Sequence, residues 1–413
     1  MSFNVALTGL NAANQDLSVT ANNLANVGTV GFKGSRAEFG DLFSATQTGV
    51  SSTAVGNGAS IQEVAQQFSQ GDIETTGNNL DLAISGNGFF TTSNNGALQY
   101  TRSGEFQVNS SGNVVTANGA RLQVYPPLPN GGFNTGGLAD LSLNTADSAP
   151  NATTTASLTA NLPANAAPPP DATFSPTDSN SYNNTTSLTV YDSLGAAHTA
   201  SLYFIKSAAA PNTWNTQLYV DNNPVGGQVE MDYNSSGALT GANPPGGTVN
   251  FPLYTPATGA ADLNMTFNFN NVTQYGNNFG VTAITQDGFT TGLLTGISID
   301  NTGVVEAQYT NGRSLQLGQV AIANFANPQG LAQQGDASWA ATNASGEPVK
   351  GVAGGSGFGT ISSGSLEESN VDTTSSLVDM ITAQRAFQAN AQMIQTEDQI
   401  GRASCRERVS KQV

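Results

Sequence analysis

A seven-residue apolar repeat occupies both ends of this 413-residue chain, and the middle of the chain lacks it. Side chains at alternating spacings of four and three form one stripe along a helix, which is the pattern of helices that pack lengthwise on one another. At the N-terminal end, Asn26, Gly28 and Gly31 follow the stripe and predict the end of its helix. The stripe itself consists of Phe3, Leu7, Leu10, Asn14, Leu17, Ala21 and Leu24.

The segment 376–400 repeats this pattern, and Ser376 with Asp379 matches a capping box at its start. Its stripe consists of Leu377, Met380, Gln384, Phe387, Ala391 and Ile394. Each stripe is thin and is interrupted by Asn or Gln, so each helix is marginal alone in water. Either helix could pack on its own domain. The matching stripes instead favour a coiled coil of the two ends.

Between the ends the apolar period changes to two, which predicts β-strands. Residues 263–269 alternate apolar and polar side chains, and Asn118-Gly119 between short apolar runs predicts a hairpin. Close spacing of the strands, with Gly, Asn and Asp turns, favours antiparallel sandwiches or barrels. Further strands are expected at 187–192, 199–205, 214–220, 281–285, 297–300, 304–309 and 318–323.

Two changes of composition suggest domain boundaries, and a nested order accounts for them. Residues 126–170 are rich in Pro, Ala, Thr and Asn and indicate a linker, and residues 351–365 are rich in Gly and Ser. We therefore expect a mainly β protein with α-helical termini, an inner β domain built from two chain segments, and an inserted outer β-barrel or sandwich. The expected bounds are 1–30 with 370–400 for the helices, 31–70 with 355–369 for connecting segments, 71–145 with 285–354 for the inner domain and 146–284 for the insert.

The net charge of −17, from 12 basic and 29 acidic side chains, disfavours nucleic acid and anionic membrane surfaces as partners. With 38% hydrophobic residues, the composition is not that of a disordered chain. No run approaches the roughly 18–20 apolar residues that a membrane-spanning helix needs, so membrane insertion is not expected. Residues 1–32 contain no Lys or Arg and do not resemble a secretory signal. A cytosolic protein and a protein exported without a cleaved signal both fit.

No combination of residues predicts catalysis, a cofactor or a metal site. His198 is the only histidine and Cys405 the only cysteine, so neither can complete a metal site or a Cys/His pair. We expect His198 to lie at the surface on a strand edge, without a chemical role. Glu367-Glu368 is interpreted as solvated charge upstream of a helix.

Both ends resemble the flagellar axial proteins, the family of rod, hook and hook–filament junction proteins. Residues 1–43 resemble the family's N-terminus, whose ANNLAN-x-x-T-x-G-F-K core spans 21–33, and residues 366–400 resemble its C-terminal signature. The matching motif residues are Asn22, Asn23, Leu24, Asn26, Gly31, Phe32 and Lys33. Residues 80–90 and 100–115 resemble distal-rod and hook members, whereas 188–206 and 317–348 resemble the hook members in particular.

The resemblance implies a non-enzymatic subunit whose terminal helices lie innermost, around a central channel. It implies self-assembly into a curved, flexible hollow tube that transmits torque from rod to filament and conducts exported subunits. The implied partners are sister copies, the distal rod protein, the hook cap protein, the hook–filament junction protein and the flagellar export apparatus. The implied location is the flagellum, outside the cell.

The resemblance departs at residues 401–413, where the family continues its apolar heptads but this chain reads GRASCRERVSKQV. Because Gly401 weakens a helix, we interpret this stretch as a non-native tail. A distal-rod or junction protein of the same family is the nearest alternative. A secreted β-rich adhesin is a more remote one, although an adhesin does not require helical stripes at both ends.

Overall fold

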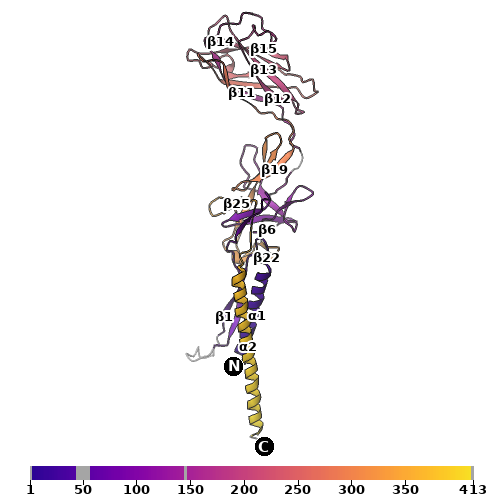
Figure 1. The fold of residues 1–413 in the computed structure, drawn as a ribbon, viewed down its shortest axis with the longest axis vertical. Helices are drawn as coiled ribbons and strands as arrows, with labels where there is room; N and C mark the ends of the chain where they lie inside the picture. The colour runs from indigo at the N-terminus through magenta and orange to yellow at the C-terminus, as the bar shows by residue number, and fades with distance from the viewer. Residues whose placement is uncertain (1, 43–55, 144–146, 411–413) are drawn as a thin grey trace. The chain divides into compact units, whose positions relative to one another are not determined.

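The computed structural model describes residues 2–42, 56–143 and 147–410, with the side chains of 3–403 inside those ranges. The chain forms two compact units (Figure 1). The first comprises Met1–Asn144, Gly296–Ala307 and Ser314–Val413, and therefore holds both ends. The second comprises Thr145–Thr295 and Gln308–Arg313. The second unit is thus inserted into the first, as the change of composition predicts.

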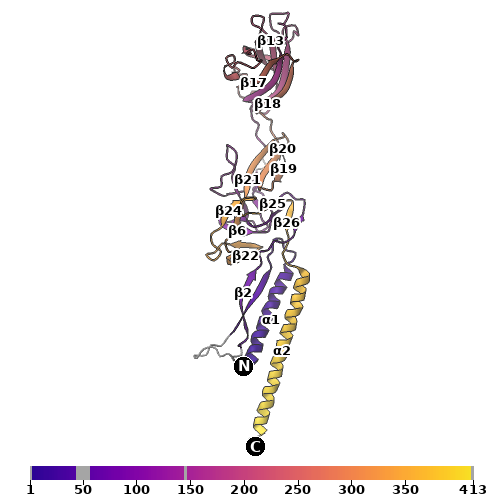
Figure 2. The same cartoon turned by 90° about the vertical axis from the view of Figure 1, so that its left-hand side faces the viewer.

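Two helices in the first unit, α1 (Ser2–Ala25) and α2 (Thr373–Ser410), lie side by side (Figure 2). Their lengths of 24 and 38 residues correspond to about 36 and 57 Å. The Oδ1 atom of Asp372 accepts the N–H of Ser375 at 2.6 Å, so Asp372 is the N-cap of α2. The predicted capping box at Ser376 is wrong, because the helix begins three residues earlier. It also continues through Gly401.

The largest sheet of the first unit combines strands from both sides of the insert, which confirms an inner β domain of two chain segments. Its main path runs β19-β20-β21-β9-β5-β6-β23-β22, and β7, β8, β10 and β24 pair beside it. The strands before the insert are β5 (Phe89–Asn94), β6 (Ala97–Thr101), β7 (Gln107–Val108), β8 (Val114–Val115), β9 (Arg121–Tyr125) and β10 (Ala139–Asp140). Those after it are β19 (Leu294–Ile299), β20 (Val304–Tyr309), β21 (Ser314–Asn324), β22 (Ala332–Gly335), β23 (Ser338–Ala340) and β24 (Val349–Val352).

Three two-stranded ladders connect this sheet region with the helices. The ribbon of β1 (Ser35–Asp41) and β2 (Ala59–Gln66) packs beside α1. The strand β4 (Leu82–Ser85) pairs with β25 (Thr360–Ser363), and β3 (Ile73–Thr75) pairs with β26 (Ser365–Glu367). The last two ladders join the start of the inner domain to the segment that leads into α2.

The second unit is a sandwich of two four-stranded sheets. One has the order β16-β17-β11-β18, with β11 (Thr155–Pro163), β16 (Thr248–Asn250), β17 (Thr266–Tyr275) and β18 (Gly280–Gln286). The other runs β12 (Asn184–Tyr191), β13 (Ala197–Lys206), β14 (Thr213–Val220) and β15 (Asn223–Asp232). Leu158 and Phe267 of the first sheet share one buried core with Trp214 of the second. The predicted barrel is not found, because the described strands form no closed sheet.

The predicted linker over 126–170 is wrong in part, because it contains the core strand β11. Ala156, Leu158, Ala160 and Leu162 are buried, and the Thr, Ser and Asn residues between them face outward. This strand pairs antiparallel with β18 but parallel with β17, which an all-antiparallel prediction does not include. The predicted boundary at residue 284 falls inside β18. The second unit continues beyond it because Asp287 accepts the N–H groups of Thr154 and Thr155 at 2.8 and 3.0 Å.

If β11 belongs to the core, Leu158→Ala should lower the free energy of unfolding of the second unit by about 2–5 kcal/mol. Leu253→Ala is the matched control, because Leu253 is exposed in the same unit and its truncation should change stability by less than about 0.5 kcal/mol. Chemical denaturation of both variants measures the difference. Equal stability of the two variants would mean that β11 is not a core strand.

Candidate self-assembly site

The buried face of each helix combines small side chains with alternate members of the predicted apolar stripes. On α1 the buried positions are Ala6, Ala13 and Thr20, and on α2 they include Ser376 and Ala383. Half-buried members of the predicted stripes alternate with these positions at spacings of four and three, namely Leu10, Leu17, Leu24, Met380 and Phe387. Half of each predicted stripe therefore shares one helix face with the buried small residues, and the other half lies outside it.

Gly9 and a pair of carboxylates define the contact between the helices. A Cβ atom at Gly9 would lie 2.8 Å from the Oδ1 atom of Asn390, so a larger residue here would require the Asn390 side chain to move. Asp16 of α1 and Asp379 of α2 line one groove, where burial and the charge of Asp379 raise the pKa of Asp16. Two facing carboxylates weaken the packing of the two helices. The contact between the helices within one chain is therefore close but only marginally stable.

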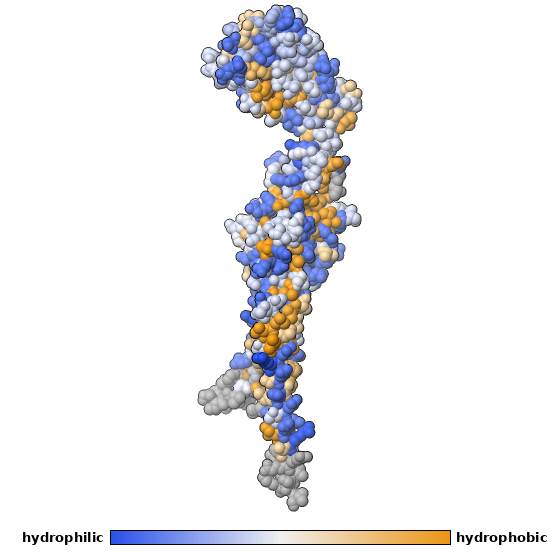
Figure 3. Space-filling view, in the orientation of Figure 1, coloured by the Kyte–Doolittle hydropathy of each residue, from blue (hydrophilic) through white to orange (hydrophobic). Residues whose placement is uncertain are grey.

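Several other large apolar side chains of the two helices remain exposed. Figure 3 shows a hydrophobic patch over the first turns of α2, where Leu377, Val378 and Ile381 are exposed. Val378 is 58% exposed and lies next to other exposed apolar residues, and such a contiguous apolar patch is typical of an interaction surface. Three of the predicted assembly residues are exposed: Phe3, Leu7 and Leu377. The others are half-buried: Leu10, Leu17, Leu24, Met380, Phe387, Ala391 and Ile394.

Asparagines of the motif at residues 22–26 organise the end of α1. The side chain of Asn26 donates to the carbonyl of Asn22 at 2.9 Å. Asn23 both accepts the N–H of Ser35 at 2.8 Å and donates to its carbonyl at 2.6 Å. The side chain of Asn23 therefore fixes the position of β1 beside the helix.

Gly31, Phe32 and Lys33 continue the motif into a buried ionic cluster. Gly31 has a φ of +68°, and a Cβ atom there would lie 2.4 Å from the backbone nitrogen of Ser103. The N–H of Gly31 donates to the carbonyl of Glu367 at 2.8 Å, and the next residue, Phe32, is buried. The Nζ atom of Lys33 lies 2.5 Å from Oε1 of Glu367 and 2.8 Å from the carbonyl of Ser69.

Arg102 completes this cluster from the other side of the same carboxylate, at 2.9 Å. Glu367 is fully buried, so the interpretation of Glu367-Glu368 as solvated charge is wrong for Glu367. Burial lowers the pKa of Lys33, and the carboxylate of Glu367 opposes this shift by favouring the ammonium form. Because two cations share one anion in the interior, removing that anion would leave both of them without compensation.

Asn370 forms a second connection just before α2. Its Oδ1 accepts the N–H of Gly34 at 2.8 Å, and its Nδ2 donates to the carbonyl of Gln67 at 2.7 Å. The sequence patterns do not predict the contacts of Arg102, Glu367 or Asn370. The bonds Arg102–Glu367, Lys33–Glu367 and Gly34–Asn370 join residues between 265 and 336 positions apart, so local periodicity carries no signal for them.

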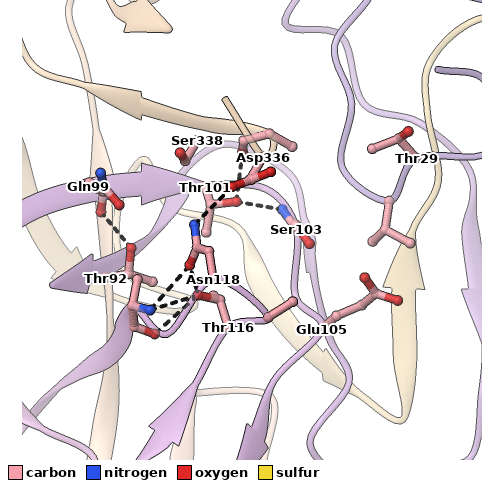
Figure 4. A pocket seen from close by; sticks show the side chains of 14 residues that line it. Thr29, Thr92, Gln99, Thr101, Ser103, Glu105, Thr116, Asn118, Asp336 and Ser338 are labelled. Atoms are coloured by element: carbon pink, nitrogen blue, oxygen red, sulfur yellow. Dashed lines mark hydrogen bonds between the residues drawn. The ribbon is translucent and has the colours of Figure 1, made fainter. Parts of the chain in front are cut away.

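A groove of about 450 Å³ lies in the first unit, lined mainly by hydroxyl and amide side chains. In Figure 4 the side chain of Asn118 points toward Asp336, 3.5 Å away, whereas Glu105 lies apart from both. Thr101 donates to the carbonyl of Ala337 at 2.8 Å. These polar groups connect the hairpin turn at Asn118 with the β22–β23 turn, and the two carboxylates do not form an acid–base pair.

The prediction of a surface His198 is wrong. Its ring is buried, with Nδ1 2.6 Å from Asp221 and Nε2 3.2 Å from Asp192. Within the described ranges, no group of three or more His, Cys, Asp or Glu side chains could hold a metal ion. Neither described helix combines the length and the apolar character needed to cross a bilayer.

Four family models match successive parts of the chain. Their descriptions are "Flagella basal body rod protein" (residues 3–33), "Flagellar hook protein FlgE/F/G D1 domain" (83–166), "Flagellar basal body protein FlaE D2 domain" (157–289) and "Flagellar basal body rod FlgEFG protein C-terminal" (362–404). Together with the helical ends and nested β units, these matches define a structural protein of the flagellar rod and hook.

Full-length relatives give the particular family. The chain is 38% identical to the flagellar hook protein FlgE of Salmonella typhimurium over 97% of this chain and 98% of that one. It is 38% identical to the FlgE of Escherichia coli K12 over the same shares, and 32% identical to that of Borreliella burgdorferi over 95% and 96%. The chain therefore belongs to the flagellar hook protein FlgE family.

A solved structure, that of the Helicobacter pylori flagellar hook protein FlgE2, has a similar fold. It aligns with a TM-score of 0.51 at 13% identity, and covers 70% of this chain and 98% of that chain. The mainly β fold with helical termini is thus confirmed.

If the ionic cluster holds the helical ends on the inner domain, Glu367→Gln should lower the free energy of unfolding of the first unit by about 3–5 kcal/mol. The amide keeps the volume of the side chain but leaves Lys33 and Arg102 buried without an anion. Glu368→Gln is the control, because this neighbouring carboxylate is exposed and should not lower the melting temperature. Thermal unfolding followed by circular dichroism compares them. Similar melting temperatures would show that the cluster does not stabilise the unit.

Proposed function

We propose that the chain is a non-enzymatic subunit of the flagellar hook that assembles into a curved, flexible hollow tube. In this proposal the tube transmits torque from rod to filament and conducts exported subunits. The observation that carries it is the exposed apolar face of α2, which Leu377, Val378 and Ile381 form. Membership of the FlgE family supports the same function.

Burial of these side chains against sister copies would supply the energy of assembly. Fully burying one Val, Leu or Ile side chain contributes about 1.5–3 kcal/mol. Leu377, Val378 and Ile381 are available on α2, and Phe3 and Leu7 on α1. A subunit that meets several neighbours gains this energy at each contact, and a repeated contact that does not close into a ring produces a helical polymer.

The amino-acid composition of the chain suits a polymer that bends as it rotates. Only 10% of the residues of the chain are charged, and Asn, Thr, Ser and Gly are abundant. Small polar side chains with bridging water resist sliding less than dry apolar contacts or tight ion pairs do. We infer that such contacts between the second units of neighbouring copies keep the tube flexible.

The proposed partners follow from the position of a hook subunit between rod and filament. They are the distal rod protein, the hook cap protein during assembly, the hook–filament junction protein and the flagellar export apparatus. The proposed location is the flagellum outside the cell, reached by export without a cleaved signal, and membership of the FlgE family supports it.

Replacing exposed apolar residues of α2 tests the proposal directly. Val378→Asp and Ile381→Asp should each raise the critical concentration for polymerisation at least about tenfold, because each removes an apolar side chain from the contact. Sedimentation measures the polymer fraction, and electron microscopy of the parent protein should show curved tubes.

Val378→Ile is the matched control, since it keeps an apolar β-branched side chain at the same position and should polymerise like the parent. Unfolding of the monomeric variants must be unchanged, which separates loss of assembly from loss of folding. Polymerisation of both aspartate variants at the parent's concentration would contradict the proposal.

A further inference from the structure

The second unit contains a buried ionic cluster that self-assembly does not explain. His198 on β13 lies between Asp192, which follows β12, and Asp221, in the turn between β14 and β15. The imidazole is only 6% exposed. The segment before β17 closes over the cluster, because Thr258 donates to Asp192 at 2.7 Å and the hydroxyl of Tyr254 donates to Asp221 at 3.4 Å.

The geometry fixes the charge of the ring. Both ring nitrogens face a carboxylate oxygen, at 2.6 and 3.2 Å, and each must donate a proton to be stable there. Only the imidazolium form has both donors. A neutral ring would direct one lone pair at a carboxylate, which is repulsive in a buried site.

The two carboxylates differ in their access to water, and therefore in their response when the ring loses a proton. Asp192 is fully buried and also accepts the N–H groups of Leu194 and Ala196, both at 2.9 Å. Asp221 is 41% exposed, so water can solvate it if it turns outward. The neutral ring should therefore keep its proton on Nε2, toward Asp192, and repel Asp221.

Asp221 is also the residue that holds its turn in place. Its Oδ1 accepts the N–H of Thr199 at 3.0 Å, and its own N–H donates to the carbonyl of Thr199 at 3.0 Å. Asp221 and Asn222 both have positive φ, 49° and 64°, the conformation of a tight hairpin turn. Outward movement of the carboxylate would remove the side-chain contact that fixes this turn on β13.

We propose that His198, Asp192 and Asp221 form a pH-sensitive clasp, which holds the β14–β15 turn on β13 and releases it in alkaline solution. Burial alone would lower the pKa of His198, but the hydrogen bonds to Asp221 and Asp192 outweigh it and raise the pKa above its ordinary value. Burial would likewise raise the pKa of Asp192, yet its hydrogen bonds, first that from Thr258, lower it to about 2. Tyr254 is the other titratable group facing the clasp, and burial together with the charge of Asp221 raises the pKa of its hydroxyl.

The direction of the pH effect follows from these shifts. Because the folded form binds the proton on His198 more tightly, its stabilisation is complete below the ordinary pKa of about 6.5. It is lost as the pH rises through the raised pKa of the folded protein. Asp192 and Asp221 stay ionised throughout this range, so only the histidine changes charge.

The full chain is well suited to a test, since His198 is its only histidine. Nuclear magnetic resonance of monomeric protein labelled with ¹⁵N in the imidazole should show both nitrogens protonated at pH 6. The midpoint should lie above 6.5, with the Nε2–H tautomer beyond it. Through the same midpoint, protection of the Thr199 amide from hydrogen exchange should fall at least about tenfold, the loss expected for a charge-assisted contact.

Asp221→Asn is the matched variant, because its amide oxygen can still accept the N–H of Thr199 while the charge facing Nδ1 is removed. In this variant the midpoint of His198 should shift downward, and the fall in Thr199 protection with pH should disappear. A parent midpoint at or below 6.5 would overturn the proposal. Constant Thr199 protection through the parent's midpoint would overturn it as well, whatever the variant does.

Discussion

The terminal helices bury faces on which small side chains alternate with half-buried apolar ones, while Leu377, Val378 and Ile381 stay exposed. Gly9 permits the close approach of the two helices, and the buried positions Ala13 and Ala383 contribute little apolar area. A helix pair of this kind gains little from its own packing, and the facing carboxylates of Asp16 and Asp379 weaken it further. We infer that the pair is completed by neighbouring copies, which makes folding of the ends part of assembly.

The buried carboxylate of Glu367 connects these marginal helices to a stable β unit. It lies just before α2 in the chain, bonds Lys33 just after α1 and bonds Arg102 of the inner domain. α1 therefore ends and α2 begins near one fixed point, even where the far ends of the helices contribute little stability. This arrangement suits a subunit that must present its ends in a defined direction before a neighbour binds them.

The sequence shows the kinds of element well but not the faces they bury. Period seven at the ends and period two in the middle predict the helices, the inserted sandwich and most strands. The burial of Ala6 and Ser376 in place of the larger Leu7 and Leu377 was not predictable, because hydrophobicity alone favours the leucines. The strand β11 was missed because Ala, Ser, Thr and Asn conceal its alternation. Glu367 and His198 seemed exposed, since the partners that allow their burial come from other parts of the fold.

Amide hydrogen exchange over residues 2–25 and 373–400, compared between free chain and polymer, tests the central claim most directly. If neighbouring copies complete the helix pair, the amides of these segments should exchange rapidly in the free chain, as in frayed helix ends. In the polymer their exchange should slow by at least about a hundredfold. Strands β5 and β14 should be protected equally in both states. Equal protection of the terminal helices before and after polymerisation would contradict the account, because it would mean that the helices are complete within one chain.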